Sequence, residues 1–210
     1  MADNITLIPA TGWGDLPEWG DPILHLLSER IFLTHRQIQR LYPIWGQGNM
    51  KRKLNKLADM NYLRRYELIT NNQKLTGYTL GIEGSRIVQR LIPDLNYYQA
   101  AQFIVANNFC MAHGVVSPRF WVSKALLSGE IKIGDDYLSL WCPRKTETRL
   151  NSLKAEVSMR CRGLIVVAPS LKLIGELSKN IEIYVPVYYV TDNQLSRFLI
   201  YKDKTLVILG

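Results

Sequence analysis

The chain has 210 residues, of which 47% are hydrophobic and 21% charged, a composition that excludes a disordered chain and is typical of a folded globular protein. The formal net charge of +8 favours a polyanionic partner. No run of about 18 apolar residues is present, so an ordinary membrane-spanning helix is excluded. We therefore expect two small domains, a cytoplasmic location and no membrane partner.

Two further features favour the cytoplasm. The first residues, Met1 to Asn4, lack the basic and apolar regions of a secretory signal. The three cysteines, Cys110, Cys142 and Cys161, are odd in number and widely spaced, so they indicate neither a disulfide framework nor a zinc site. We expect them to be reduced and partly buried.

The first 20 residues include Trp13, Trp19 and three glycines, which predicts an irregular arm over residues 1–20. Two tryptophans are a large apolar surface for a free tail. We expect them to pack on the domain or on a second protomer, with a disordered tail as the alternative. A helix is then predicted with Asp21 as its N-cap and Pro22 at its first position.

A strongly basic segment follows, and it is the most informative part of the chain. Between Arg30 and Arg90 there are twelve lysines and arginines but only three acids. Thr34 is the expected N-cap of a helix that Pro43 ends, and a short turn with two glycines comes next. This order of cap, helix and turn predicts that a second helix starts near Gly48.

The second helix has one apolar stripe and one polar face. Its apolar residues recur at i, i+4, i+7 and i+8, the spacing of a helix with a single buried side. They are Met50, Leu54, Leu57 and Ala58. On the far side lie Asn49, Arg52, Lys56 and Asp59, flanked by Lys53 and Asn55. A cationic, amide-bearing face therefore looks outward.

Two β-prone runs come after this helix. Residues 64–69 and 75–80 are joined by a polar tip at Asn71-Asn72, which predicts a hairpin. A hairpin directly after such a helix is the wing of a winged helix-turn-helix, and Ile82 to Leu91 is predicted to close the unit as another helix. Arginine and lysine can neutralise phosphates, while arginine and asparagine can pair with base edges in the major groove.

We therefore predict a winged helix-turn-helix domain over residues 21–93 that binds double-stranded DNA. The expected contact residues are Gln47, Asn49, Lys51, Arg52, Lys53, Asn55, Lys56, Arg64, Arg65 and Lys74. The 49–56 face would enter the major groove, and Arg64, Arg65 and Lys74 would hold neighbouring phosphates. Two alternatives stay open: a basic face that is merely solvated, and a winged helix that binds protein.

Residues 94–210 have the pattern of a separate α/β domain. Helices are predicted over 97–111, 147–160 and 171–177. Strand-like runs alternate with them over 120–122, 130–133, 137–141, 164–167, 182–190, 198–201 and 206–209. Because 163–168 is an unbroken apolar run, we predict a mixed sheet with this strand at its centre. The expected fold class is α+β, a winged helix-turn-helix followed by an α/β domain.

Three motifs of the N-terminal half carry a resemblance. They are Leu33-Thr34 with Gln37-Ile38, Arg52-Lys53-Leu54 followed by Asn61-Tyr62-Leu63-Arg64-Arg65, and Gly77-Tyr78-Thr79-Leu80-Gly81. With this pattern, residues 30–92 resemble the replication-relaxation family of plasmids and other mobile elements, and the remainder does so only by layout. The resemblance implies a plasmid- or phage-type DNA-binding protein, acting as a homodimer in replication, conjugative transfer or transcriptional control, with replication or transfer proteins as possible partners.

The resemblance also implies a restriction-endonuclease-like second half. An active form holds Mg²⁺ with two carboxylates and orients water with a lysine or glutamine. Asp136 matches the first carboxylate, but residues 141–145 offer no second acid, unless Glu130 or Glu156 supplies it. Asp135 and Asp136 also suit a turn. We therefore predict no enzyme activity, catalytic residue, metal or cofactor, with a metal-dependent nuclease targeted by its winged helix as the alternative.

The remaining charged and histidine residues carry no catalytic pattern. Arg144, Lys145, Arg149 and Lys154 are expected to form a basic helix face that contacts nucleic acid or is solvated. The histidines are too far apart in sequence to form a local metal-ligand pair, and His25 is expected to pack within its apolar helix.

Overall fold

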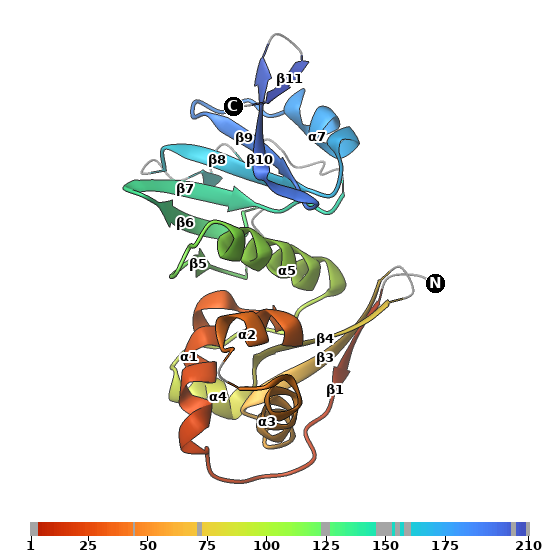
Figure 1. Ribbon diagram of the computed structural model, residues 1–210, viewed down its shortest axis with the longest axis vertical. Coiled ribbons are helices and arrows are strands. Elements are labelled where there is room, and N and C mark those ends of the chain that lie inside the picture. The colour runs from red at the N-terminus through yellow and green to blue at the C-terminus, as the bar shows by residue number, and fades with distance from the viewer. Residues whose placement is uncertain are drawn as a thin grey trace. The chain divides into compact units, whose positions relative to one another are not determined.

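The structure is a computed structural model that describes residues 4–43, 45–70, 73–122, 127–145, 153, 156–157, 161–202 and 205–208. The chain divides into two compact units, Met1–Ala100 and Ala101–Gly210, and each contains one sheet (Figure 1). The fold class is mixed α+β, as predicted. Within the described residues, no helix has the length and apolar character needed to cross a membrane.

The first unit combines helices with an antiparallel four-stranded sheet of order β1-β3-β4-β2. In chain order its elements are β1 (Asn4–Ile8), the 3-10 turn η1 (Glu18–Gly20), α1 (Asp21–Arg30), β2 (Leu33–Thr34), α2 (His35–Leu41), α3 (Gln47–Asp59), β3 (Leu63–Thr70), β4 (Gln73–Leu80) and α4 (Ile82–Ile87). Figure 1 shows α2 and α3 beside the β3–β4 hairpin. The predicted tip of that hairpin, Asn71-Asn72, lies outside the described residues.

Local sequence signals explain α2 and α3. The Thr34 side chain accepts a hydrogen bond from the Gln37 backbone N–H at 3.3 Å, and the Gln37 side chain accepts one from the Thr34 backbone N–H at 2.9 Å. This reciprocal capping box confirms Thr34 as the N-cap. In α3, Met50, Leu54 and Leu57 are fully buried, so the predicted apolar stripe faces the core.

The N-terminal residues are more ordered than the sequence indicates. Residues 4–8 form β1, which pairs along β3, although an irregular arm was expected over 1–20. Residues 5–8, Ile-Thr-Leu-Ile, are apolar or β-branched and favour a strand, and β3 supplies the partner on which they pair. Between β1 and η1 the chain is irregular, and the backbone N–H groups of Thr11 and Gly12 donate to the Asp59 carbonyl at 3.1 and 2.8 Å.

The two N-terminal tryptophans behave differently. The Trp19 ring meets Trp45 edge-on, with 6.0 Å between ring centroids, so Trp19 packs on its own unit as expected. The Trp13 side chain does not, because it is 83% exposed.

Several smaller expectations for element ends are wrong. The residue before α1 is Gly20, whose helical backbone continues η1 into the helix, so Asp21 is already helical and its side chain caps nothing. Asp21 instead lies 3.6 Å from His25, which is exposed rather than packed. Helix α4 ends at Ile87 and not at Leu91, because Gln89 has a φ of 52° that no α-helix can accommodate.

The second unit is built on a seven-stranded sheet of order β11-β10-β9-β8-β7-β6-β5. Its elements are α5 (Tyr97–Ala112), which begins in the first unit, β5 (Arg119–Phe120), β6 (Gly129–Ile133), β7 (Asp136–Trp141), β8 (Gly163–Ala168), α7 (Leu171–Ser178), β9 (Val187–Thr191), β10 (Gln194–Lys202) and β11 (Thr205–Ile208). Strand β8 pairs in parallel with β7 and β9, and the other pairs are antiparallel. The predicted mixed sheet with residues 163–168 at its centre is confirmed.

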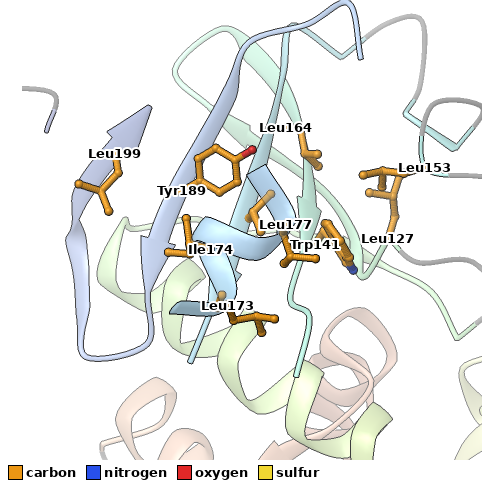
Figure 2. Close-up of a cluster of buried hydrophobic side chains, with 11 residues drawn as sticks. Leu127, Trp141, Leu153, Leu164, Leu173, Ile174, Leu177, Tyr189 and Leu199 are labelled. Carbon is orange, nitrogen blue, oxygen red and sulfur yellow. The ribbon is translucent and has the colours of Figure 1, made fainter. Parts of the chain in front are cut away.

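Helices cover both faces of this sheet. On one face, Ile174 and Leu177 of α7 pack in a cluster with Trp141 and Leu164 (Figure 2). On the other face, Phe109 of α5 meets Phe198 of β10 at a centroid distance of 6.2 Å. Every residue of β8 is buried as a result. The predicted helix over 147–160 lies mostly outside the described residues.

Candidate nucleic-acid interface

The polar face of α3 is open to solvent. Lys51, Arg52 and Lys56 are exposed, as is Asn49, and Asn55 is half-buried. This outer face is a shallow hollow of about 580 Å³ that runs from Gly48 to Met60. The sequence prediction of an outward cationic side of α3 therefore agrees with the positions of these side chains.

A deeper hollow of about 740 Å³ lies beside it, between α2, α3 and the hairpin strands β3 and β4. Its charged lining residues are Arg36, Lys51, Arg65, Glu67 and Lys74. Gly48, Lys51 and Asn55 line both hollows, so they form a ridge between the outer face of α3 and the groove. A ligand that covers α3 would reach this ridge from either side.

Positive charge in this region is mostly uncompensated. Of the six lysines and arginines that line the two hollows, five form no ion pair with a carboxylate within the described parts of the chain. They are Arg36, Lys51, Arg52, Lys56 and Arg65. Arg52 has a neutral partner, since its Nη2 donates to Asn49 Oδ1 at 3.3 Å. A hydrated cation without a carboxylate partner can exchange its water for a phosphate group.

Arg64 does not belong to this set, although the sequence assigned it to phosphates. Its side chain is only 17% exposed, and Nη1 donates to Asp94 Oδ1 at 2.9 Å and to the Ile92 carbonyl at 3.1 Å. Neighbouring residues of a strand point to opposite faces, so Arg64 faces away while Arg65 lines the groove. Arg64 ties β3 to the segment that follows α4.

Replacing Arg64 and replacing Arg65 by alanine should therefore have different effects. Arg64→Ala is expected to lower the free energy of unfolding by about 1 kcal/mol, because a mostly buried guanidinium loses its hydrogen bonds to the Ile92 carbonyl and to Asp94. Arg65→Ala should leave unfolding unchanged and weaken duplex binding. Thermal denaturation and fluorescence anisotropy on both variants measure the two effects, and the opposite pattern would show that the assignment of the two arginines is reversed.

Lys53 is also used internally. Its ammonium lies 3.8 Å from the centroid of the Trp45 ring and 4.6 Å from that of Trp19, which are cation–π distances. Tyr42 packs on Trp45 at 5.8 Å. Lys53 thus fastens α3 to η1 and to the turn before α3, and it is less available to DNA than the prediction assumed.

Lys74 and Gln47 complete the expected contact residues. Lys74 Nζ lies 2.7 Å from Glu67 Oε2 on the paired strand, so its charge is partly neutralised within the groove. Gln47 begins α3, and its side chain lies outside the described residues. Glu67 is a groove residue that the sequence reasoning did not single out, as is Arg36.

A buried tyrosine touches the ridge. The Tyr78 hydroxyl on β4 donates to Asn55 Oδ1 at 3.2 Å, and the Tyr78 side chain is 1% exposed. The pKa of Tyr78 is raised to about 12, chiefly by burial, with smaller effects of Arg65, which lowers it, and Asp59, which raises it. The hydroxyl therefore keeps its proton at neutral pH. Sequence reasoning missed this contact, because Tyr78 and Asn55 are far apart in the chain.

No family model, curated protein sequence or solved structure matches this chain. The resemblance to the replication-relaxation family therefore stays a prediction that rests on the motifs quoted above. The basis for inferring a function is the geometry and charge around α3.

The carboxylates suggested for a nuclease site do not converge. Asp136 lies 3.1 Å from Arg162 Nη1. The strand register pairs Asp136 with Ile133 and Glu130 with Ser139, so Asp136 and Glu130 point to opposite faces of the sheet. Glu156 accepts a hydrogen bond from the Leu127 backbone N–H at 3.1 Å. Where side chains are described, no group of three histidine, cysteine or acidic residues could hold a metal ion.

The structure also tests two other expectations for the second unit, the turn at Asp135 and the basic face that includes Arg144. Gly134 and Asp135 form the turn between β6 and β7, with Gly134 at a φ of 59°, so the turn interpretation is confirmed for Asp135, while Asp136 is already the first residue of β7. Arg144 is not part of a solvated basic face, because its Nη2 donates to the Val167 carbonyl at 2.6 Å and it pairs with Asp192. The expected neighbours in that face, 149 and 154, lie outside the described residues.

The cysteines fit the sequence expectation more closely. Cys110, Cys142 and Cys161 are free and buried. Complete burial raises the pKa of Cys142 to about 12, so this thiol is a core residue and not an activated nucleophile.

Proposed function

We propose that the first unit is a winged helix-turn-helix that binds double-stranded DNA with sequence preference. In this proposal α2, the following turn and α3 are the helix-turn-helix, and β3 and β4 are the wing. The order α1, β2, α2, α3, β3, β4 supports it, as does the antiparallel pairing of the short β2 with β4.

The observation that carries the proposal is the set of uncompensated cations around α3. Arg52 and Lys56 stand on its outer face, Lys51 on the ridge, and Arg36 and Arg65 on the far side of the groove. A helix of 13 residues is about 20 Å long and fits the major groove. In that position Arg52 and Asn55 would face base edges, while the other cations would face phosphates.

The wider role is a proposal that rests on the resemblance to the replication-relaxation family. We propose a non-enzymatic protein of a plasmid- or phage-type element, acting in replication, conjugative transfer or transcriptional control. A homodimer is the proposed binding species. The exposed side chains of Val207 and Ile208 on the edge strand β11 support a protomer contact there.

Salt dependence tests the proposal directly. With four phosphate-facing cations (Arg36, Lys51, Lys56 and Arg65), the logarithm of the association constant should fall against the logarithm of salt concentration with a slope of about −3 to −4 for each protomer bound. Anisotropy of a labelled mixed-sequence duplex between about 50 and 200 mM salt measures this slope. An affinity that does not change with salt, or no affinity for any duplex, would overturn the proposal.

A cleavage assay separates this function from the nuclease alternative. Because Asp136 is paired with Arg162 and lies on the opposite face from Glu130, we expect no cutting of single- or double-stranded DNA with Mg²⁺ or Mn²⁺. Cutting that Asp136→Ala abolishes would establish the nuclease. Arg162→Ala is the matched control, since it frees the same carboxylate without removing it.

A further inference from the structure

Asn55 occupies a special place on α3. It lines both the outer hollow and the groove, so its side chain stands on the ridge that a duplex would meet. Lys51, one helical turn earlier on the same ridge, is a flexible cation with no bonded side-chain partner among the described residues. The amide of Asn55 is held from behind, because the Tyr78 hydroxyl donates to its Oδ1 at 3.2 Å.

We propose that Tyr78 fixes the orientation of the Asn55 amide so that Asn55 reads an adenine in the major groove. This inference rests on the proposed function. It adds that α3 selects adenine and that Tyr78 maintains this selection by orienting Asn55. Asn55 is the contact residue, and Tyr78 is a positioning residue that does not touch the DNA.

The hydrogen-bonding capacity of an amide explains the selection. The oxygen of an asparagine side chain has two lone pairs, and its nitrogen has two N–H groups. Tyr78 uses one lone pair of Oδ1, so the other can accept from the adenine N6 amino group while Nδ2 donates to N7. Guanine presents oxygen O6 in place of the amino group, and an amide oxygen locked on that side meets an acceptor.

Several features keep Tyr78 in place. Its side chain is almost completely buried, and its strand is paired on both sides, with Leu33 of β2 and Arg65 of β3 as register partners. The hydroxyl remains a donor, since burial raises its pKa to about 12. Without this donor the amide can rotate, and a half-turn would place Nδ2 against the N6 amino group and Oδ1 against N7, so adenine would lose both hydrogen bonds.

The test is a selection of bound fragments from a random duplex pool with five full-length proteins, the wild type and four variants. The wild type should enrich a site in which one adenine is preferred over guanine by about 10-fold or more. Asn55→Ala should lose the preference at that position alone. Tyr78→Phe should reduce the preference well below the wild-type value, because the amide is no longer pre-oriented, while the slope of affinity against salt stays unchanged, because no phosphate contact is lost.

Tyr66→Phe is the matched control. Tyr66 is another buried tyrosine of the same hairpin, but its hydroxyl donates to Asp94 and not to a residue of α3. The control variant should keep the adenine preference of the wild type. Asn55→Asp gives an independent readout, because a carboxylate cannot donate to N7 and should shift the preference from adenine towards cytosine.

The outcomes separate this inference from the proposed function. If the wild type enriches no duplex, the proposed function fails. If it enriches a site but Asn55→Ala retains every base preference, DNA binding stands and the role of Asn55 is overturned. A folded Tyr78→Phe variant with full adenine preference overturns the role of Tyr78. NMR relaxation of the wild-type Asn55 side-chain amide is a second check of Tyr78, since an order parameter below about 0.6 would show that the amide is not held.

Discussion

A protein in which Lys51, Arg52 and Lys56 are all changed to glutamate is expected to bind duplex DNA at least about 100-fold more weakly than the wild type. The three side chains project from the same exposed face of α3. None of them has a carboxylate partner within the described structure. Each change removes a cation that displaces a counterion from DNA and adds an anion that repels phosphate. Fluorescence anisotropy at about 0.1 M salt measures the loss.

A second triple variant controls for net charge. Lys172, Lys179 and Arg197 are exposed residues of the second unit, and changing them to glutamate alters the charge of the protein by the same amount. This control should bind DNA almost as the wild type does, and both variants should unfold at the wild-type temperature. Equal losses of affinity in the two variants would mean that overall charge, and not α3, governs binding. Wild-type affinity in the α3 variant would favour a winged helix that binds protein.

Leu54→Ala is expected to lower the free energy of unfolding of the first unit by about 2–5 kcal/mol. Leu54 is fully buried on the side of α3 that packs against β3, so the shorter side chain leaves a cavity. The cationic face is untouched by the change. DNA binding should therefore be lost only in proportion to the unfolded fraction, which calorimetry and anisotropy over a range of temperatures determine.

Leu54→Met is the volume-conserving control and should cost less than about 1.5 kcal/mol. Well below its unfolding temperature, each of the two variants should bind duplex DNA with the affinity of the wild type. A fully folded Leu54→Ala protein that binds weakly would contradict the separation of core and contact faces on α3.

The elements that the sequence predicts well are those with a local cause. The apolar spacing of α3 is contained within 13 residues, and the capping box of α2 within four. The unbroken apolar run of β8 is equally local, and it predicts a central strand because only a strand covered on both faces needs apolar residues at every position. Strand β1 has strand-forming residues of its own, but the strand on which it pairs, β3, lies about sixty residues away in sequence, and only that pairing orders it as a strand.

The candidate site was predicted less completely for the same reason. Helical spacing places Arg52 and Lys56 outward, and both are exposed. Whether a basic residue is free, however, depends on partners elsewhere in the chain. Arg64 meets Asp94, and Lys53 meets Trp19, and neither pairing is visible in the sequence near the cation. Strand alternation could have separated Arg64 from Arg65, since neighbours on a strand cannot both face one groove.

The most direct test of the central claim, that the exposed face of α3 lies against duplex DNA, is site-specific photocrosslinking. All three native cysteines are buried, so a cysteine introduced as Arg52→Cys can be labelled selectively with a photoactivatable group, and Lys179→Cys in the second unit serves as the comparison. On illumination of the complex, we predict a crosslink to bases of the duplex from position 52 and a much lower yield from position 179. A complex that forms normally but crosslinks only from position 179 would contradict the claim.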